Sequence, residues 1–199
     1  MAENGTTGKW QVLDAAHGAL RAVVRGIPVD RLDAPTPCAE WNVTQVLQHA
    51  AGDQIGYAAF LTGGPGPAEN PFEPSGKLAD TPEAVVEAAL TASFEAWETV
   101  DPAAEQVGVP LPPHSMTPAL GVGACALDAA VHAWDIAVAT GQPSPLTDEL
   151  ARELLPVAHA TVEAVRAFAF APALAEQAGE GEAARLLRYL GRRPDWASN

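Results

Sequence analysis

An aspartate and a histidine stand four residues apart in the stretch LDAAVHAWDIAVATGQ, residues 127–142. In an α-helix, side chains at positions i and i+4 lie on the same face, one above the other. Asp128 and His132 would therefore bring a carboxylate oxygen and an imidazole nitrogen within reach of one divalent metal ion. Such a pair is more often a local hydrogen bond, so a metal site requires a third ligand from elsewhere in the chain.

The best third ligand is His49, in the middle of a second predicted helix. If the two helices are neighbours, two imidazoles and one carboxylate converge. That set leaves coordination positions open, which is typical of a catalytic rather than a structural metal site. Helical bundles commonly build metal sites from side chains on facing helices. A lone helical histidine is more often a hydrogen-bonded core residue, so spacing alone leaves both interpretations open.

Three further polar side chains lie near the candidate ligands. Asp135 follows Asp128 on nearly the same helical line and is a candidate to orient a ligand or to anchor a neighbouring helix. Asp53 lies one turn after His49 and is a pocket candidate. Cys125 falls within about 60° of the Asp-His pair around the helix, although a cysteine there is most often a small buried hydrophobe. No general base stands out.

Helical periodicity and helix-start signals predict the elements that would position these residues. Asn42 with Gln45 is a capping-box pair, and Thr81-Pro82 and Thr117-Pro118 each combine an N-cap with a proline in the first turn. No stretch alternates apolar and polar residues over strand length. We therefore expect an all-α fold, a four-helix bundle with additional short helices. The predicted helices span residues 9–26, 43–61, 81–100, 117–140, 147–168 and 182–190.

Length and composition bound the class of protein. The 199 residues are enough for a single domain, residues 1–199, with residues 1–8 as a disordered tail. No run approaches the ~18 apolar residues of a membrane span, and no secretory signal is visible. The two cysteines are too few for a disulfide framework. A cytoplasmic protein with reduced thiols and no membrane partner is expected.

The formal net charge of −14 argues against nucleic acid as a partner. Binding to nucleic acid needs clustered lysine and arginine, and only 11 such residues are present. The expected partners are therefore small molecules. The sequence leaves open whether the protein is a monomer or a homodimer.

Two motifs and the ending of the chain resemble a known family. PTPCAEWNVTQVLQHAAG resembles the Pro-Cys-x-x-Trp-x-Val motif of DinB-like helical-bundle proteins in the branch of the mycothiol-dependent maleylpyruvate isomerase N-terminal domain. VHAWDIAVATGQP resembles the second motif of that branch, with an acid four residues before its histidine. RYLGRRPDW resembles the ending of its single-domain members.

The resemblance implies a DinB-like four-helix bundle that holds a divalent metal ion on His49, Asp128 and His132. Zinc is the usual expectation, with nickel or another divalent ion as the alternative. It also implies a low-molecular-weight thiol as cosubstrate, such as mycothiol or bacillithiol. A metal-bound sulfur persists as thiolate at neutral pH and attacks a small electrophile. The implied activity is that of a metal-dependent, thiol-dependent transferase or isomerase.

Two features depart from the isomerase type. Asp128 stands where the isomerase has a glutamate, so this ligand is one methylene shorter. The chain also ends soon after its last predicted helix, leaving no room for the further C-terminal domain of the isomerase. We therefore expect a reaction other than maleylpyruvate isomerisation. The alternative hypothesis is a non-catalytic protein, with or without metal, that binds a small ligand or assists a biosynthetic pathway.

Overall fold

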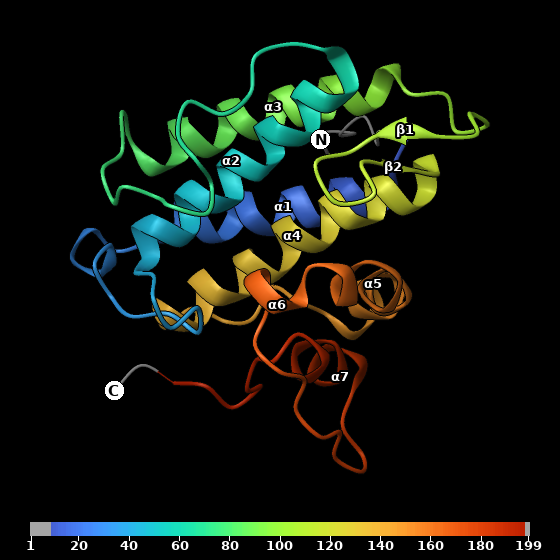
Figure 1. Ribbon diagram of the computed structural model, residues 1–199. Coiled ribbons are helices and arrows are strands. Elements are labelled where there is room, and N and C mark those ends of the chain that lie inside the picture. Colours follow the sequence, from blue (N-terminus) through green and yellow to red (C-terminus); the bar gives the residue numbers. More distant parts are fainter. Residues whose placement is uncertain (1–8, 198–199) are drawn as a thin grey trace, which may run out of the picture.

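Four long helices form the core of the computed structural model, which describes residues 9–197; the tail predicted at residues 1–8 lies outside that range. Helix α1 packs against α3 and α4, and α2 packs against the same two helices, so the four close into a bundle (Figure 1). The all-α prediction is confirmed. The bounds are α1 Gln11–Arg25, α2 Val43–Thr62, α3 Pro82–Thr99 and α4 Pro118–Ala139.

The two helices that carry the candidate ligands begin at the predicted residues. Asn42 accepts a hydrogen bond from the Gln45 backbone N–H at 2.9 Å, and the Gln45 side chain accepts one from the Asn42 backbone at 3.1 Å. This capping box starts α2. Thr117 accepts from the Leu120 N–H and precedes a proline at the first position of α4. These caps fix where along each helix the ligand residues fall.

Helix α4 is the central element and is buried along nearly its whole length. By length and mean hydropathy it could cross a membrane, although Asp128, His132 and Asp135 interrupt its apolar residues. Of its most apolar window, 89% is buried inside the protein, as in the core helix of a soluble protein. Gly123 allows a close approach, since a Cβ there would lie 2.7 Å from Val157 of the next helix.

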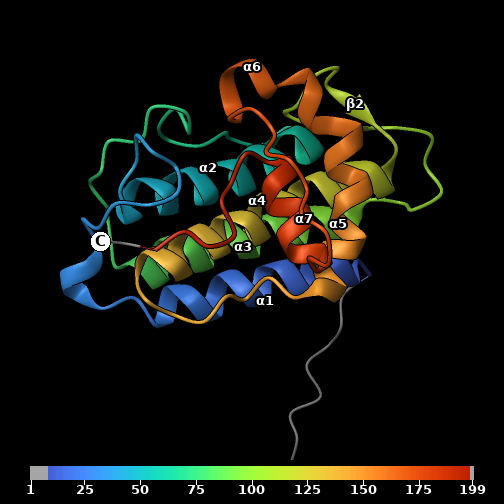
Figure 2. The same cartoon turned by 90° about the horizontal axis from the view of Figure 1, so that it is seen from below.

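A second layer of shorter helices follows the bundle. Helix α5 (Asp148–Thr161) packs on α4, and α7 (Glu182–Tyr189) packs on α5 (Figure 2). The prediction of one helix over residues 147–168 was wrong. The Thr161 hydroxyl donates to the Val157 carbonyl, a bond that tends to bend helices, and the chain continues as the 3-10 turn Val162–Ala164 and the short helix α6 (Arg166–Ala169). Val162 and Val165 are thereby buried, so tertiary packing outweighs helix propensity.

Two loops cover the bundle. One small addition to the all-α fold is a two-stranded sheet, in which β1 (Val107–Gly108) pairs antiparallel with β2 (Ser115–Met116). Two residues per strand are too few to show an alternating pattern in the sequence. The loop after α2 folds back along that helix, where Gln48 accepts from the Gly76 N–H at 2.7 Å. One further 3-10 turn, Val29–Arg31, follows α1.

Candidate metal centre

The three predicted ligands meet between α2 and α4. Each of His49, Asp128 and His132 offers one ligand atom, and these atoms all lie within 4.8 Å of one another. Asp128 Oδ1 lies 3.4 Å from His132 Nε2 and 3.7 Å from His49 Nε2. The two imidazole rings are nearly perpendicular, with centroids 4.8 Å apart. Helix packing thus brings together two imidazoles and a carboxylate from positions about 80 residues apart in the chain.

The second nitrogen of each imidazole is occupied by a hydrogen bond. His49 Nδ1 lies 2.9 Å from the carbonyl oxygen of Pro71, in the loop that folds back over α2. His132 Nδ1 lies 3.0 Å from Asp135 Oδ2. Both acceptors require a proton on Nδ1, so in the neutral form of each imidazole the lone pair is on Nε2, on the side of Asp128. Histidines that bind metals are commonly oriented by such bonds to carbonyls and carboxylates.

One oxygen of the central carboxylate has no partner. Asp128 Oδ2 is buried and makes no hydrogen bond, and no other carboxylate oxygen within residues 9–197 is in this state. A buried polar atom without a partner costs roughly 1–3 kcal/mol, and more when it is charged. A divalent cation bound by Oδ2 and the two Nε2 atoms would remove that cost. The residues present therefore fit a metal ion.

Burial and neighbouring charges shift the pKa values of the three candidate ligands, and for His132 and Asp128 they act in opposite directions. Burial and the neighbouring His132 lower the pKa of His49 to about 4, so its imidazole is neutral. Burial alone would lower the pKa of His132, but the Asp128 and Asp135 carboxylates outweigh it and raise that pKa well above its usual value. Burial would raise the pKa of Asp128, and the two imidazoles outweigh it, so its pKa is lowered. Without metal, the centre is thus a buried Asp128–His132 ion pair, and a metal ion would displace its proton.

Asp53 lies beside the ligand set. Its Oδ2 is 3.7 Å from His49 Nε2, and its side chain remains partly exposed in the cavity. Burial and the Asp128 carboxylate raise the pKa of Asp53 well above its usual value. A carboxyl with a raised pKa is suited to hold or move a proton near neutral pH. The predicted pocket residue therefore reaches the candidate metal centre.

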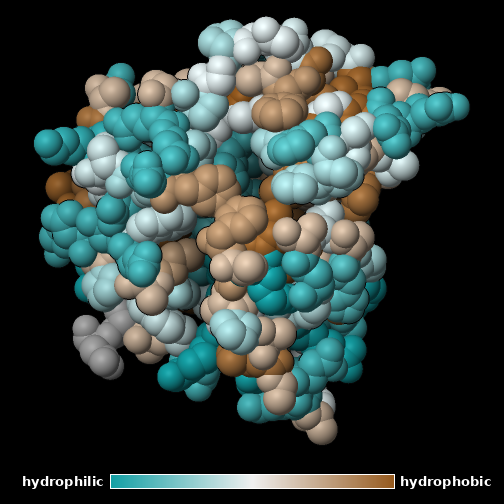
Figure 3. All heavy atoms as spheres, viewed as in Figure 1, coloured by the Kyte–Doolittle hydropathy of each residue, from teal (hydrophilic) through white to brown (hydrophobic). Residues whose placement is uncertain are grey.

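The centre opens into a cavity of about 590 Å³, large enough for a small molecule. Its deep end is polar and its walls are largely apolar. The Trp41 ring lies 4.7 Å from the His49 ring, and Phe72 contacts both His49 and Phe168. Apolar side chains gather across the middle of the face seen in Figure 3, around a small hollow. A ligand in this cavity would meet the metal ligands at one end and aromatic side chains along its length.

The two remaining predicted site residues have different surroundings. Asp135 is fully buried next to His132, as described above. Cys125 does not line the cavity. Its Sγ donates to Gln54 Oε1 at 3.1 Å and lies 3.5 Å from Ser93 Oγ, and burial raises its pKa to about 12. Cys125 therefore belongs to the bundle interior and not to the cavity.

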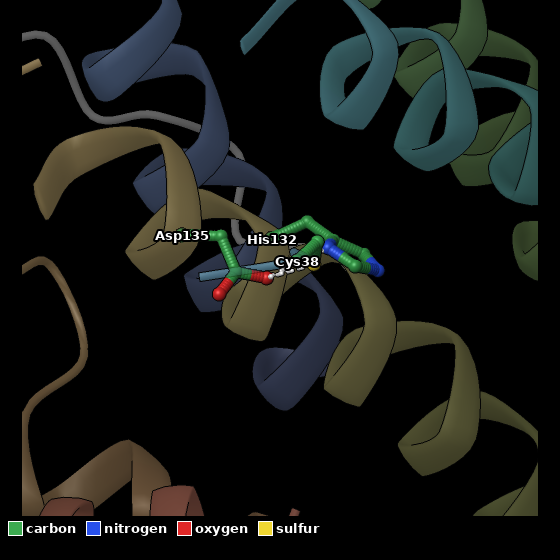
Figure 4. Close-up of side chains that lie close together, drawn as sticks. All are labelled: Cys38, His132 and Asp135. Carbon is green, nitrogen blue, oxygen red and sulfur yellow. Dashed lines mark hydrogen bonds and ion pairs between the residues drawn. The ribbon is translucent and has the colours of Figure 1, made fainter. Parts of the chain in front are cut away.

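The other cysteine lies beside the site. Cys38, His132 and Asp135 form a second close cluster, with the cysteine on the connector before α2 and the other two on α4 (Figure 4). Cys38 Sγ donates to Asp135 Oδ2 at 3.3 Å. Arg192 Nη2 lies 2.7 Å from the same oxygen and 3.5 Å from Sγ. The Arg192 guanidinium already neutralises the charge of the Asp135 carboxylate. We therefore interpret this cluster as one that orients His132 through its Nδ1, not as a second metal site.

Comparison with known proteins places the bundle in a family. The family described as "Mycothiol maleylpyruvate isomerase N-terminal domain" matches residues 13–137. The chain belongs to this family. Two proteins of Mycobacterium tuberculosis, "Uncharacterized protein Rv0738" of strain ATCC 25618 / H37Rv and "Uncharacterized protein MT0763" of strain CDC 1551 / Oshkosh, are each 32% identical over 149 residues. Each alignment covers 74% of this chain and 75% of the relative. No solved structure matches the chain.

The match to the isomerase N-terminal domain family covers the three candidate ligands, Cys38 and Asp135, but 11 of the 26 residues that line the cavity come after it. Sequence reasoning missed Arg192, which lies in this later part. One signal was available, because a buried aspartate such as Asp135 requires a cationic or hydrogen-bonding partner. The tail contains the only adjacent pair of arginines, Arg192 and Arg193. The wall residues after position 137 are Thr161, Val162, Val165, Ala167, Phe168, Ala169, Phe170, Ala171, Leu190, Gly191 and Arg192.

Proposed function

We propose that this protein is a divalent-metal enzyme that uses a low-molecular-weight thiol to transform a small electrophile, as a transferase or isomerase. The observation that carries the proposal is the buried, unpartnered Asp128 Oδ2 between two oriented imidazoles at the end of a cavity. The family's printed description names mycothiol, which supports a thiol of that type, with bacillithiol as the alternative. Zinc suits two imidazoles and one carboxylate with an open position, and nickel is the second candidate.

The residues of the chain would divide the work as follows. His49, Asp128 and His132 hold the metal ion, while the Pro71 carbonyl and Asp135 keep the two imidazoles in the required tautomer. A bound divalent ion supplies a Lewis acid that lowers the pKa of a thiol placed on it. Such a site needs water excluded from the reacting atoms, since charge interactions strengthen in a dry environment. Aromatic side chains of the wall, among them Trp41, Phe72 and Phe168, would serve that purpose.

Asp53 is the carboxyl placed to move a proton in this reaction. It lies in the cavity at the edge of the ligand set, and its raised pKa makes its ionised form a stronger base than an ordinary aspartate. In the ionised form it would accept the thiol proton, and in the protonated form it would return that proton to the product. A cavity of about 590 Å³ suits a small molecule, so the expected electrophile is a small metabolite. We expect the reaction to take place in the cytoplasm.

Metal content tests the first half of the proposal. Elemental analysis of the purified wild-type protein should find about one zinc or nickel ion per chain, and the double variant His49→Ala/His132→Ala should contain almost none. His159→Ala is the matched control, because that histidine is exposed and packs against Tyr189 on the second layer. Equally little metal in the wild type and in the double variant would contradict the proposal.

Calorimetry with mycothiol and bacillithiol tests the second half. The proposal expects heat of binding that disappears when the metal is removed by a chelator and returns when it is restored. Binding of a small molecule that survives chelation would instead support the non-catalytic alternative. Asp53→Asn should bind the thiol but react slowly with electrophiles, which separates its role in proton transfer from metal binding.

A further inference from the structure

Arg192 reaches the candidate metal centre from outside the part of the chain that matches the family. Its guanidinium makes a two-point contact with Asp135, with Nε 2.9 Å from Oδ1 and Nη2 2.7 Å from Oδ2. Both side chains are at least nine-tenths buried. The same Oδ2 accepts the hydrogen bond from His132 Nδ1. A continuous chain of contacts therefore runs from Arg192 through Asp135 to the proposed metal ligand His132.

The geometry of this contact controls how Asp135 can act. A carboxylate held at both oxygens by one planar guanidinium cannot rotate, so Oδ2 stays on the line of the His132 N–H. Without the guanidinium, the carboxylate would be buried with too few hydrogen-bond partners and would shift its position.

The C-terminal segment delivers Arg192 to this position. Helix α7 is anchored by buried Leu186 and Leu187, and the backbone N–H of Arg192 donates to the Leu187 carbonyl at 2.8 Å. Gly191 has φ +77, a left-handed conformation that glycine adopts readily. The chain turns there, and Arg192 enters the protein with its Cζ 5.9 Å from the centre of the Phe170 ring.

We propose that Arg192 is a positioning residue for the metal site, and that docking of the segment from α7 to Arg192 is energetically coupled to metal binding. The proposal rests on the proposed function, since it concerns the same site. Coupling between two events is reciprocal. Arg192 should strengthen metal binding by fixing His132, and a bound metal should in turn hold the C-terminal segment more firmly in place.

Metal affinity in a matched set of variants tests the first direction of the coupling. Zinc affinity is measured by competition with a chromogenic chelator for the wild type, Arg192→Gln, Arg192→Lys and Arg188→Gln. Arg192→Gln should weaken zinc binding about 10- to 100-fold, the usual effect of losing a group that orients a metal ligand. Arg192→Lys should show a smaller loss, because a lysine keeps the charge but cannot span both carboxylate oxygens.

Arg188→Gln is the control from the same segment. Arg188 pairs with Glu180 at 2.7 Å and has no contact with the metal centre, so its loss should change zinc affinity less than twofold. Equal zinc affinity in the wild type and both Arg192 variants would overturn this inference alone. A wild type that binds no zinc, nickel or other divalent ion would overturn the proposed function and, with it, this inference. If Arg192→Gln fails to fold, as judged by circular dichroism without metal, the lysine variant decides.

Hydrogen exchange tests the reverse direction with a readout that a purely structural role would not move. Zinc should slow amide exchange in residues 182–192 of the wild type and of Arg188→Gln. In Arg192→Gln, exchange in this segment should be fast with and without zinc, while α4 remains protected. Zinc-independent exchange in residues 182–192 of a wild type that binds zinc would show that the segment is not coupled to the site.

Discussion

Two clusters of polar side chains lie inside the bundle, and both draw on α2 and α4. In the interior network, His17, Ser93 and Cys125 all donate to Gln54 Oε1, and Gln54 Nε2 donates to the Cys125 carbonyl. In the candidate metal centre, about one helical turn away along α2, Asp128 Oδ2 has no partner. The interior network is closed, whereas the metal centre is incomplete and opens into the cavity.

The difference shows that residue types alone do not identify a metal site. Burial lowers the pKa of His17 and of His49 alike, each to about 4, so the two imidazoles are equally neutral. What separates them is the contact at Nε2. His17 Nε2 is bonded to an amide oxygen at 2.9 Å, whereas His49 Nε2 lies 3.7 Å from a carboxylate that lacks a second partner. The predictions below start from this contrast.

Replacing one histidine of each cluster by glutamine should give the largest difference, which is in zinc content. His132→Gln removes a proposed ligand and should abolish stoichiometric zinc binding. His17→Gln keeps an N–H donor near Gln54 and should leave the zinc content at about one ion per chain. Elemental analysis of the two folded variants checks the pair. Similar zinc loss in both would mean that the two clusters are not functionally distinct.

Gln54→Leu should destabilise the protein. It removes the common partner of His17, Ser93 and Cys125, which leaves His17 Nε2 without its hydrogen bond and the Ser93 hydroxyl and the Cys125 thiol with only their weak mutual contact. The expected loss is about 2–4 kcal/mol of unfolding free energy. Urea unfolding monitored by circular dichroism in the presence of a chelator measures it. A loss below about 0.5 kcal/mol would contradict a tightly satisfied network.

The interior network should also make the metal-free protein sensitive to acid. Burial holds the pKa of His17 at about 4 in the folded state, below the ordinary value of 6.5 for a histidine. The unfolded chain therefore binds more protons between these values, and stability rises with pH across that window. The contribution of His17 is complete above pH 6.5 and is lost as the pH falls toward 4, by about 3 kcal/mol at most. His17→Gln should flatten the slope of unfolding free energy against pH in chelator.

Much of the fold and of the centre follows from local sequence signals. The caps at Asn42 and Thr117 set where α2 and α4 begin, and the i, i+4 spacing puts Asp128 and His132 on one face. The addition of His49 depended on the two helices being neighbours, which the resemblance implied and spacing alone did not. The caps and spacing are properties of short segments, which explains why the sequence was sufficient for them.

The errors arose where distant segments meet. A helical wheel placed Cys125 within about 60° of the candidate ligands, but it could not show that this edge of α4 faces Gln54 rather than the cavity. The break after Thr161 and the approach of Arg192 likewise depend on packing between α4, α5 and α7. No local pattern encodes those contacts.

The smallest expected effect concerns the two cysteines, which compare the accessibility of the cavity with that of the interior network. Labelling them need not change the stability of the protein. Cys38 lines the cavity wall, whereas Cys125 is fully buried and its pKa is raised to about 12 by burial. Thiolates are the reactive species, so a maleimide should label Cys38 within minutes and leave Cys125 unlabelled until urea unfolds the bundle. Mass spectrometry should count one label in the native protein and two in urea, and Cys38→Ser should reduce the native count to zero. Labelling of Cys125 in the native form of that variant would show that the interior network opens to solvent. The two clusters would then no longer differ in their access to solvent.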